Sequence, residues 1–428
     1  MDTVAGLTTI PSSPLRGLLR SSLFRRWAVA NLFARLPLTM NLLALVLVGE
    51  AVTGSLATGA TLAGILTFTT GLLAQPRGRR LDRSDLRAGL RRDLLLSALV
   101  MAAFVGAVVV EMPVWVLGLL AATEGVASAA ILGGFRALLV PTVTADEIEP
   151  ANALDAVFVE VAFVAGPAVA GASALVVGPV GVLVLQTMSF VIAAALLRGL
   201  PTRLPVRDLQ QAGPAPVRTR GAGSVYLLGL GIGLCLGAWE ATMPARLETF
   251  GLAPASAGPL LALTALGSGL AGLVAANQRD PLRRGRLVAG VLLVAFAIVL
   301  IPSAIAPNLV LLGVALFAVG IPIAPLNALA GLVLQRTVAV PRQAEGFSLF
   351  PAMILIGAGV GQVLAGFLLR YLTPAEVIQG LALLPAALGA LVFVAMGRRR
   401  LAGMPPGVGY PYDPLVADPE AYVQPLHP

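Results

Sequence analysis

The sequence predicts an all-α polytopic membrane protein with twelve transmembrane helices in two six-helix halves. Three observations lead to this fold class. Hydrophobic residues make up 57% of the chain and charged residues only 12%, and the mean hydropathy of +0.90 is far above that of a soluble domain. Apolar segments of the roughly 20 residues that cross a bilayer as helix recur twelve times. The arginines gather at alternate ends of these segments.

The spanning segments and the connections between them set the expected domain organisation. We expect the chain to cross the membrane at residues 27–49, 54–76, 94–110, 113–134, 151–177, 179–198, 224–245, 254–276, 287–305, 308–333, 346–369 and 375–396. The resulting units are an N-terminal arm (1–26), a first bundle (27–200), a linker (201–223), a second bundle (224–397) and a tail (398–428). The arm has no apolar run before a small-residue cleavage site, so it is not a signal peptide. The linker and the proline-rich tail are expected to be flexible and disordered, respectively.

The distribution of positive charge orients the chain. All 29 basic residues are arginines, and all but Arg35, Arg246 and Arg370 fall on one side if both termini lie there. By the positive-inside rule we expect both termini to be cytoplasmic, in a multi-pass protein of the cell membrane. Because the arginines lie at segment ends, the net charge of +8 does not indicate nucleic-acid binding.

The loop between the second and third expected helices, GRRLDRSDLRAGLRR, carries the first resemblance to a known family. Its order of glycine, Asp-Arg and a later Arg pair resembles the signature of the major facilitator superfamily. In that family the loop is a cytoplasmic latch, whose Asp meets a helix end of the other half and an Arg after the fourth helix. The corresponding residues are Gly78, Asp82, Arg83, Arg91, Arg92 and, as the partner, Arg136. The spacing is stretched here, and a merely solvated loop is the alternative.

A second resemblance lies in the fifth helix, where Gly166, Pro167 and Gly171 in GPAVAG are similar to the Gly-Pro motif of antiporters in this superfamily. Proline kinks a helix and small residues permit close helix contact, so the motif suits a hinge or a sealed seam. Plain packing is the alternative. RALLVPTV, ANALD, GAWEATMPARLE and AEGFSLF also resemble exporters of this superfamily that are common in actinobacteria.

Charged residues inside the membrane are few and therefore candidates for function. Arg35 and Glu160 lie at similar depths and could form a pair, with Asp155 nearer the surface. Alternatively, Arg35 snorkels to the interface and Asp155 caps its helix. Glu124 in the fourth helix and Glu240 in the seventh are candidate proton carriers, because these helices line the central cavity in the family. Glu240 could instead lie near a wet outer mouth.

The second half offers backbone irregularities more than charge. Gly229, Gly233 and Gly237 form a small-residue stripe on the seventh helix, as do Gly357 and Gly361 on the eleventh. In the tenth helix, Pro322 and Pro325 beside Asn327 predict a break that could expose carbonyl groups to substrate. A kink that serves packing alone is the alternative. The loop with Asp280, Arg283 and Arg284 echoes the latch loop, as a duplicated fold would.

These features predict a secondary transporter, a proton-coupled exporter of small amphipathic compounds that works as a monomer by alternating access. A metabolite importer or facilitator and a non-transporting membrane scaffold are the alternatives. The single Cys235 and single His427 exclude disulfides, zinc sites and His-based catalysis. Because no loop carries paired carboxylates or a nucleophile with a base, we expect neither an enzyme nor a cofactor, and no bound metal.

Overall fold

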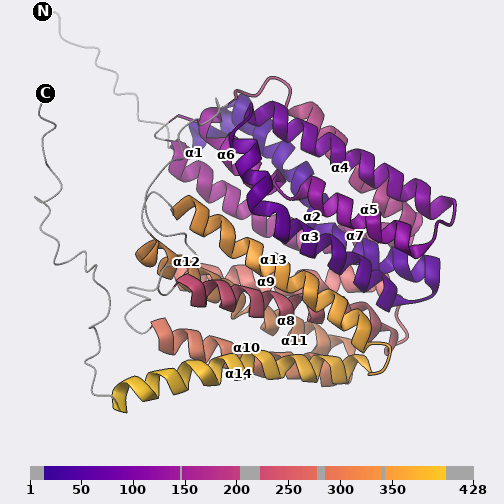
Figure 1. Cartoon of the computed structure of the whole chain (residues 1–428), viewed down its shortest axis with the longest axis vertical. Coiled ribbons are helices and arrows are strands. Elements are labelled where there is room, and N and C mark those ends of the chain that lie inside the picture. Colours follow the sequence, from indigo (N-terminus) through magenta and orange to yellow (C-terminus); the bar gives the residue numbers. More distant parts are fainter. Residues whose placement is uncertain (1–13, 145–146, 203–221, 277–284, 339–342, 402–428) are drawn as a thin grey trace, which may run out of the picture.

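The computed structural model describes residues 14–144, 147–202, 222–276, 285–338 and 343–401. The first part of the expected arm, nearly all of the linker, the loop with Asp280 and most of the tail lie outside these ranges. Within them the chain is helical and contains no strand. Figure 1 shows the helices of the first half beside those of the second, with both sets running roughly along one direction.

The first half comprises α1 to α7. Its helices are α1 (Pro14–Arg20), α2 (Ser22–Thr53), α3 (Leu56–Asp82), α4 (Leu86–Val109), α5 (Val114–Ser128), α6 (Ile131–Leu139) and α7 (Ile148–Leu196), with the 3-10 turn η1 (Val140–Thr142). The first spanning helix begins before the expected Trp27, because Ser21 caps it by accepting a hydrogen bond from the Phe24 N–H.

The second half comprises α8 to α14. Its helices are α8 (Ala222–Glu248), α9 (Ala257–Ala276), α10 (Gly285–Ile305), α11 (Leu309–Gly320), α12 (Ile323–Thr337), α13 (Gln343–Leu368) and α14 (Pro374–Leu401), with the 3-10 turn η4 (Pro254–Ser256). Eleven helical stretches of the described chain are long and apolar enough to cross a membrane. One of them, α7, contains two spans, because Gly178 breaks it with a φ of 72° and a ψ of 170°. The predicted twelve-segment architecture is therefore confirmed.

Two spanning segments are broken in equivalent places of the two halves. The fourth segment is divided into α5 and α6 at Ala129 and Ala130, and the tenth into α11 and α12 at Ile321 and Pro322. The break in the tenth segment lies where Pro322 was expected to cause one. No proline lies at the break in the fourth segment, so the sequence gives no sign of it. That both halves are broken at equivalent positions supports the duplicated architecture.

Prolines inside helices free carbonyl groups that neighbouring helices satisfy. Pro37 in α2 has no N–H to donate to the Phe33 carbonyl, which instead accepts a 2.7 Å hydrogen bond from the Ser189 hydroxyl of α7. In the other half, Pro385 in α14 frees the carbonyl of Leu381, and the Cys235 thiol of α8 donates to it at 3.6 Å. The first and sixth segments, and likewise the seventh and twelfth, are thus joined at a proline kink.

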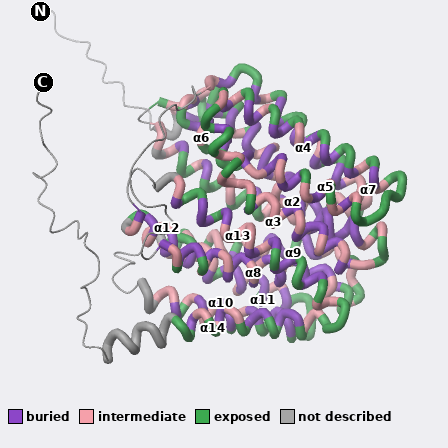
Figure 2. The backbone as a smooth tube through the Cα atoms, in the orientation of Figure 1, coloured by how far each residue is buried: buried purple, intermediate pink, exposed green. Residues whose placement is uncertain are grey.

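The glycine stripes on α8 and α13 pack against each other. A methyl group on Gly233 would overlap the Ile354 carbonyl oxygen, and one on Gly361 would overlap the Leu234 carbonyl oxygen. The two backbones therefore touch, which only residues without side chains allow. Figure 2 shows buried residues concentrated where helices meet and exposed ones on the outer surfaces. Many of the exposed side chains are large and apolar, as a lipid-facing surface requires.

The two halves meet along α3 with α13 and along α7 with α9. We call the end of the bundle that carries α1 the α1 end, and the end that carries the α2–α3 and α8–α9 turns the mouth end. At the α3–α13 contact, Gly71 lies against the backbone of Ile356 and Gly359 lies against that of Phe68. These close approaches hold the halves together along this contact.

Candidate functional site

A cavity of about 850 Å3 opens at the mouth end between the two halves. Its walls come from the α2–α3 turn, the break in α7, the end of α8 and the α13–α14 turn. The lining residues are Leu47, Glu50, Ala51, Gly54, Ser55, Leu56, Ala57, Pro179, Ala245, Glu248, Thr249, Leu369, Arg370 and Pro374. Because both halves contribute to it, a movement of one half against the other changes its shape.

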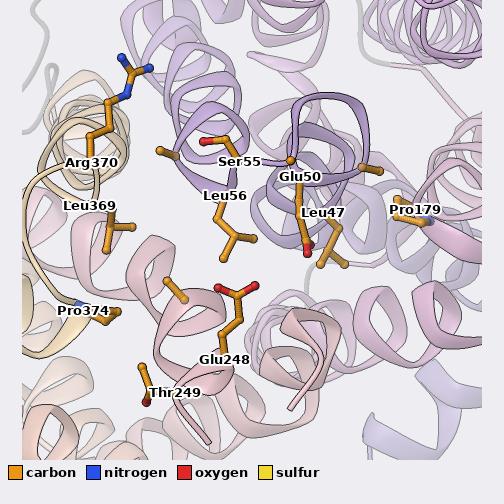
Figure 3. A pocket seen from close by; sticks show the side chains of 14 residues that line it. Leu47, Glu50, Ser55, Leu56, Pro179, Glu248, Thr249, Leu369, Arg370 and Pro374 are labelled. Carbon is orange, nitrogen blue, oxygen red and sulfur yellow. The ribbon is translucent and has the colours of Figure 1, made fainter. Parts of the chain in front are cut away.

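Two carboxylates dominate the polar part of this cavity. Glu50 of α2 and Glu248 of α8 extend into it from different halves, while the guanidinium of Arg370 turns away from both (Figure 3). Between these charges the wall is apolar, with Leu47, Leu56 and Leu369 among the lining residues. The cavity thus combines charged carboxylates with an apolar wall, and this combination suits amphipathic molecules.

At the α1 end, α3 and α13 are joined by an ion pair across the two halves. Arg79, in the last turn of α3, binds the carboxylate of Glu345, in the first turn of α13. Gln75, one turn earlier on α3, donates to the same carboxylate oxygen at 3.1 Å. The halves are therefore joined at the α1 end by this ion pair. At the mouth end they also touch beside the cavity, where Gly366 lies against the Ala57 carbonyl and Gly171 against the Ala255 carbonyl.

The predicted latch loop lies next to this ion pair, but its Asp82 is exposed at the end of α3, as is the following Arg83. The loop is attached to its own half. Asp85 accepts hydrogen bonds from the Ala88 N–H at 2.7 Å and from the Thr202 hydroxyl at 3.0 Å. The N–H of Ala88 is the main reason that the pKa of Asp85 lies below its usual value. In this conformation, Arg79 and not Asp82 makes the ion pair to the other half.

The remaining residues of the latch motif are also placed within the first half. Gly78 lies in the last part of α3 and leaves room for a side chain, while Arg91 and Arg92 lie in the first turns of α4. Arg92 is 3.3 Å from the carboxylate of Asp93, which Arg77 of α3 also approaches at 2.9 Å. Asp93 is buried, and the sequence analysis did not single it out.

Asp155 is the centre of a buried polar cluster near the α1 end. One of its oxygens accepts from Arg35 at 2.6 Å and from Asn31 at 2.9 Å, and the other accepts from Arg136 at 3.2 Å. Arg35 also donates to the Asn31 side chain, at 2.9 Å. Asp155 and Arg35 are each no more than 5% exposed. The cluster ties α2, α6 and α7 together, and a buried pair of this kind is costly to break by removing one partner.

This cluster corrects three expectations. Arg35 pairs with Asp155 and not with Glu160, because residues five apart on a helix point about 140° away from each other, so only one can face α2. Asp155 is also not a helix cap, since α7 already begins at Ile148. Arg136 binds Asp155 and therefore does not serve Asp82 in this conformation. Glu160 instead lies close to Gly269 of α9, at the contact between the two halves.

Glu124 lies inside the first half, on α5. It is fully buried, and neither of its carboxyl oxygens has a hydrogen-bond partner. Ser97 of α4, also fully buried, lies beside it. The prediction that Glu124 faces the central cavity is not met in this conformation, because it is not among the cavity residues. An unpaired carboxylate away from water is costly, so this environment suits a carboxyl group that holds a proton.

The other predicted site residues lie along the second half and at the seam between the halves. Glu240 is half-buried on α8, eight residues before the cavity residue Glu248. Pro325 lies in the first turn of α12, directly after the break at Pro322, and Asn327 follows in the same helix. The four predicted residues, Glu240, Pro322, Pro325 and Asn327, do not line the mouth cavity, whereas Glu248 does.

The Gly-Pro motif lies at two close helix contacts. A methyl group on Gly171 would overlap the Ala255 carbonyl oxygen, and one on Gly258 of α9 would overlap the Pro167 carbonyl oxygen. Gly166 lies against Thr39 of α2 in the same way. The motif therefore packs α7 directly against α9 and the η4 turn, across the two halves and toward the mouth end. Its role in antiport stays a prediction.

Sequence reasoning missed the cavity residues Glu50, Glu248 and Arg370, and also Glu345. All four lie at helix ends, where charge is ordinary, and only their meeting across the two halves distinguishes them. Among the residues that the structure describes, no group of three His, Cys, Asp or Glu side chains could hold a metal ion.

Comparison with known proteins identifies the fold. No protein-family model matches the sequence, and no curated protein matches it. Solved structures do match, over nearly their whole lengths. A crystal structure of the nucleoside transporter NupG aligns with a TM-score of 0.67 and 13% identity, covering 87% of this chain and 98% of that one. The chain has the major facilitator fold.

Further solved structures show the same architecture. The human organic anion transporter MFSD10 aligns with a TM-score of 0.63 and 13% identity, covering 89% of this chain and 100% of that one. A bacterial homologue of the iron transporter ferroportin, in an inward-facing state, aligns with a TM-score of 0.63 and 16% identity, covering 88% and 98%. At these identities the likeness establishes the fold and leaves the substrate open.

Proposed function

We propose that this protein is a proton-coupled exporter of small amphipathic compounds that works by alternating access. The observation that carries the proposal is a cavity that lies between the two halves and is lined by both of them. A cavity between the halves is open at the mouth end, while the Arg79–Glu345 ion pair fastens α3 to α13 at the α1 end. A site between two halves that rock against each other is the arrangement expected of such a transporter. Its fold is shared with transporters of nucleosides and organic anions.

We further propose that the α1 end faces the cytoplasm. All arginines other than Arg35, Arg246 and Arg370 fall on the side of the membrane to which this end belongs, and the positive-inside rule places that side in the cytoplasm. The mouth cavity then faces the outside of the cell. Its cavity has the size of known small-molecule sites, which are roughly 300–1,000 Å3. Its combination of apolar wall and carboxylates supports amphipathic substrates over sugars.

Glu124 is the proposed proton carrier. Its complete burial and unpartnered oxygens support a protonated carboxyl group in the described state. Release of the proton then requires a rearrangement of α4 against α5 that gives the carboxylate water or a partner, which couples protonation to the movement of the helices. Glu240, half-buried on a helix that lines the cavity, is the second candidate.

The test is proton movement across proteoliposomes that contain the purified protein, as lipophilic cations, antibiotics, nucleosides and organic acids are added in turn. We expect an amphipathic compound to trigger proton flux, and Glu124→Gln to abolish it while substrate exchange continues. Glu111→Gln is the control, because Glu111 is an exposed acid in a mouth-end turn. Flux that follows an imported metabolite favours the importer. Undiminished flux in both Glu124→Gln and Glu240→Gln would contradict the assignment of either carrier.

A further inference from the structure

A second hollow lies on the side of the first half, beyond the mouth cavity. It is a groove of about 510 Å3 between α3 and α5. Its floor and walls are almost entirely apolar and include Leu62, Ile65, Trp115, Gly118 and Leu119. Trp115 is 68% exposed and Leu119 60%, so the groove is open to the membrane and not enclosed by protein.

The groove runs along α3 and α5 from the mouth end into the membrane. Trp115 belongs to the first turn of α5, and Thr58 to the first turn of α3, so both lie at the mouth end. Ile65 lies seven residues after Thr58 and Ala122 seven residues after Trp115, so both lie deeper by roughly 10 Å at 1.5 Å per residue. The groove therefore runs from the interface through about two thirds of one leaflet, whose hydrocarbon is about 15 Å thick. It can hold the upper part of an acyl chain.

A single cation stands at the interfacial end of the groove. Arg370, two residues after the end of α13, lines both the groove and the mouth cavity. Figure 3 shows its guanidinium turned away from Glu50 and Glu248. Among the described carboxylates, none forms an ion pair with it. A positive group at headgroup depth, above an apolar channel that can hold the upper part of an acyl chain, is complementary to an anionic lipid.

We infer that the α3–α5 groove binds an anionic phospholipid of the mouth-side leaflet, with an acyl chain along Ile65 and Leu119 and the phosphate group on Arg370. The site is separate from the proposed substrate cavity and shares only Arg370 with it. It does not depend on which compound is transported or on proton coupling. One arginine near an anionic headgroup is expected to favour an anionic over a zwitterionic lipid roughly fivefold.

The chain offers a built-in reporter of this site. It has three tryptophans, of which Trp27 and Trp239 are fully buried, while Trp115 lies in the groove. The protein is reconstituted into phosphatidylcholine bilayers. In one series an increasing fraction of the lipid is phosphatidylglycerol with bromine on its acyl chain, and in the other it is phosphatidylcholine with bromine on its acyl chain. Bromine quenches a tryptophan that it touches, and Trp115→Phe gives the background from the other two.

We expect brominated phosphatidylglycerol to quench Trp115 at a roughly fivefold lower fraction than brominated phosphatidylcholine. Arg370→Gln should remove this preference and Arg370→Lys should keep most of it, which separates loss of charge from misfolding. Arg246→Gln is the matched control, since Arg246 also lies at the mouth end but binds the Ala306 carbonyl and Thr249. Equal quenching by the two lipids in the wild type, or a preference that survives in Arg370→Gln, would overturn the inference.

Discussion

The ion pair between Arg79 and Glu345 is expected to bias the protein toward the state with an open mouth, so removing it should open the α1 end more often. The side chain of Arg79 is 54% exposed and that of Glu345 25% exposed. Solvent screens such a pair, and its contribution is roughly 0.2–1 kcal/mol. A free-energy difference of 1.4 kcal/mol changes an equilibrium constant about tenfold. Arg79→Gln should therefore raise the ratio of the α1-end-open state to the mouth-open state by up to about fivefold.

Cysteine labelling can measure this shift, because the only native cysteine, Cys235, is fully buried. Ala352→Cys places a thiol at a position of α13 that is 3% exposed beside Gly71 of α3. A maleimide reaches it only when the α1 end opens. In the Arg79→Gln background its labelling rate should rise up to about fivefold. A thiol at Thr249, in the mouth cavity, should label no faster.

Two controls make this prediction refutable. Arg80→Gln removes an exposed arginine one residue further along α3 and should leave the labelling rate unchanged. Exchanging the charges, Arg79→Glu with Glu345→Arg, should restore the wild-type rate. If Arg79→Gln and Arg80→Gln behave alike, or if the exchange restores nothing, the ion pair does not bias the two states.

Three further predictions concern stability, each measured by thermal unfolding in detergent. Ser189→Ala should destabilise the protein by about 1–2 kcal/mol, because the Phe33 carbonyl loses its donor; no change would mean that water replaces the hydroxyl. Asp85→Ala should cost about 1 kcal/mol at neutral pH, as the loss of an N-cap does. Because the folded pKa of Asp85 is lowered, this cost should be present above roughly pH 4–5 and fade as the pH falls further, and a pH-independent cost would contradict the assignment. Gly361→Ala should cost about 1–3 kcal/mol through overlap with α8, whereas Gly380→Ala, which meets open space, should not.

The fold could be predicted from the sequence because a bilayer leaves few choices. Every backbone group must be paired inside it, so a long apolar run is a helix, and the number of runs gives the number of spans. The expected spans 151–177 and 179–198 divide at residue 178, where Gly178 breaks α7, and Pro322 marked the break in the tenth. The break at Ala129 left no comparable sign, since alanine is compatible with an unbroken helix.

The site was less predictable, because it depends on which charges meet. The sequence analysis singled out Arg35, Asp155 and Arg136, but it paired Arg35 with Glu160 and Arg136 with Asp82. In the structure both arginines bind Asp155, because it is Asp155 that faces them from α7. Glu50 and Glu248 lie at helix ends, where a charge needs no explanation. Only the packing of the two halves brings them to one cavity.

The central claim, that the two ends of the bundle open alternately, is tested most directly by distances between spin labels. One pair, at Ser55 and Thr249, spans the mouth cavity, and another, at Arg83 and Ser348, joins α3 to α13 at the α1 end. On addition of a transported compound, or on a change of pH, the first distance should shorten in the same fraction of molecules in which the second lengthens. Distances that stay fixed, or that lengthen together, would contradict alternating access.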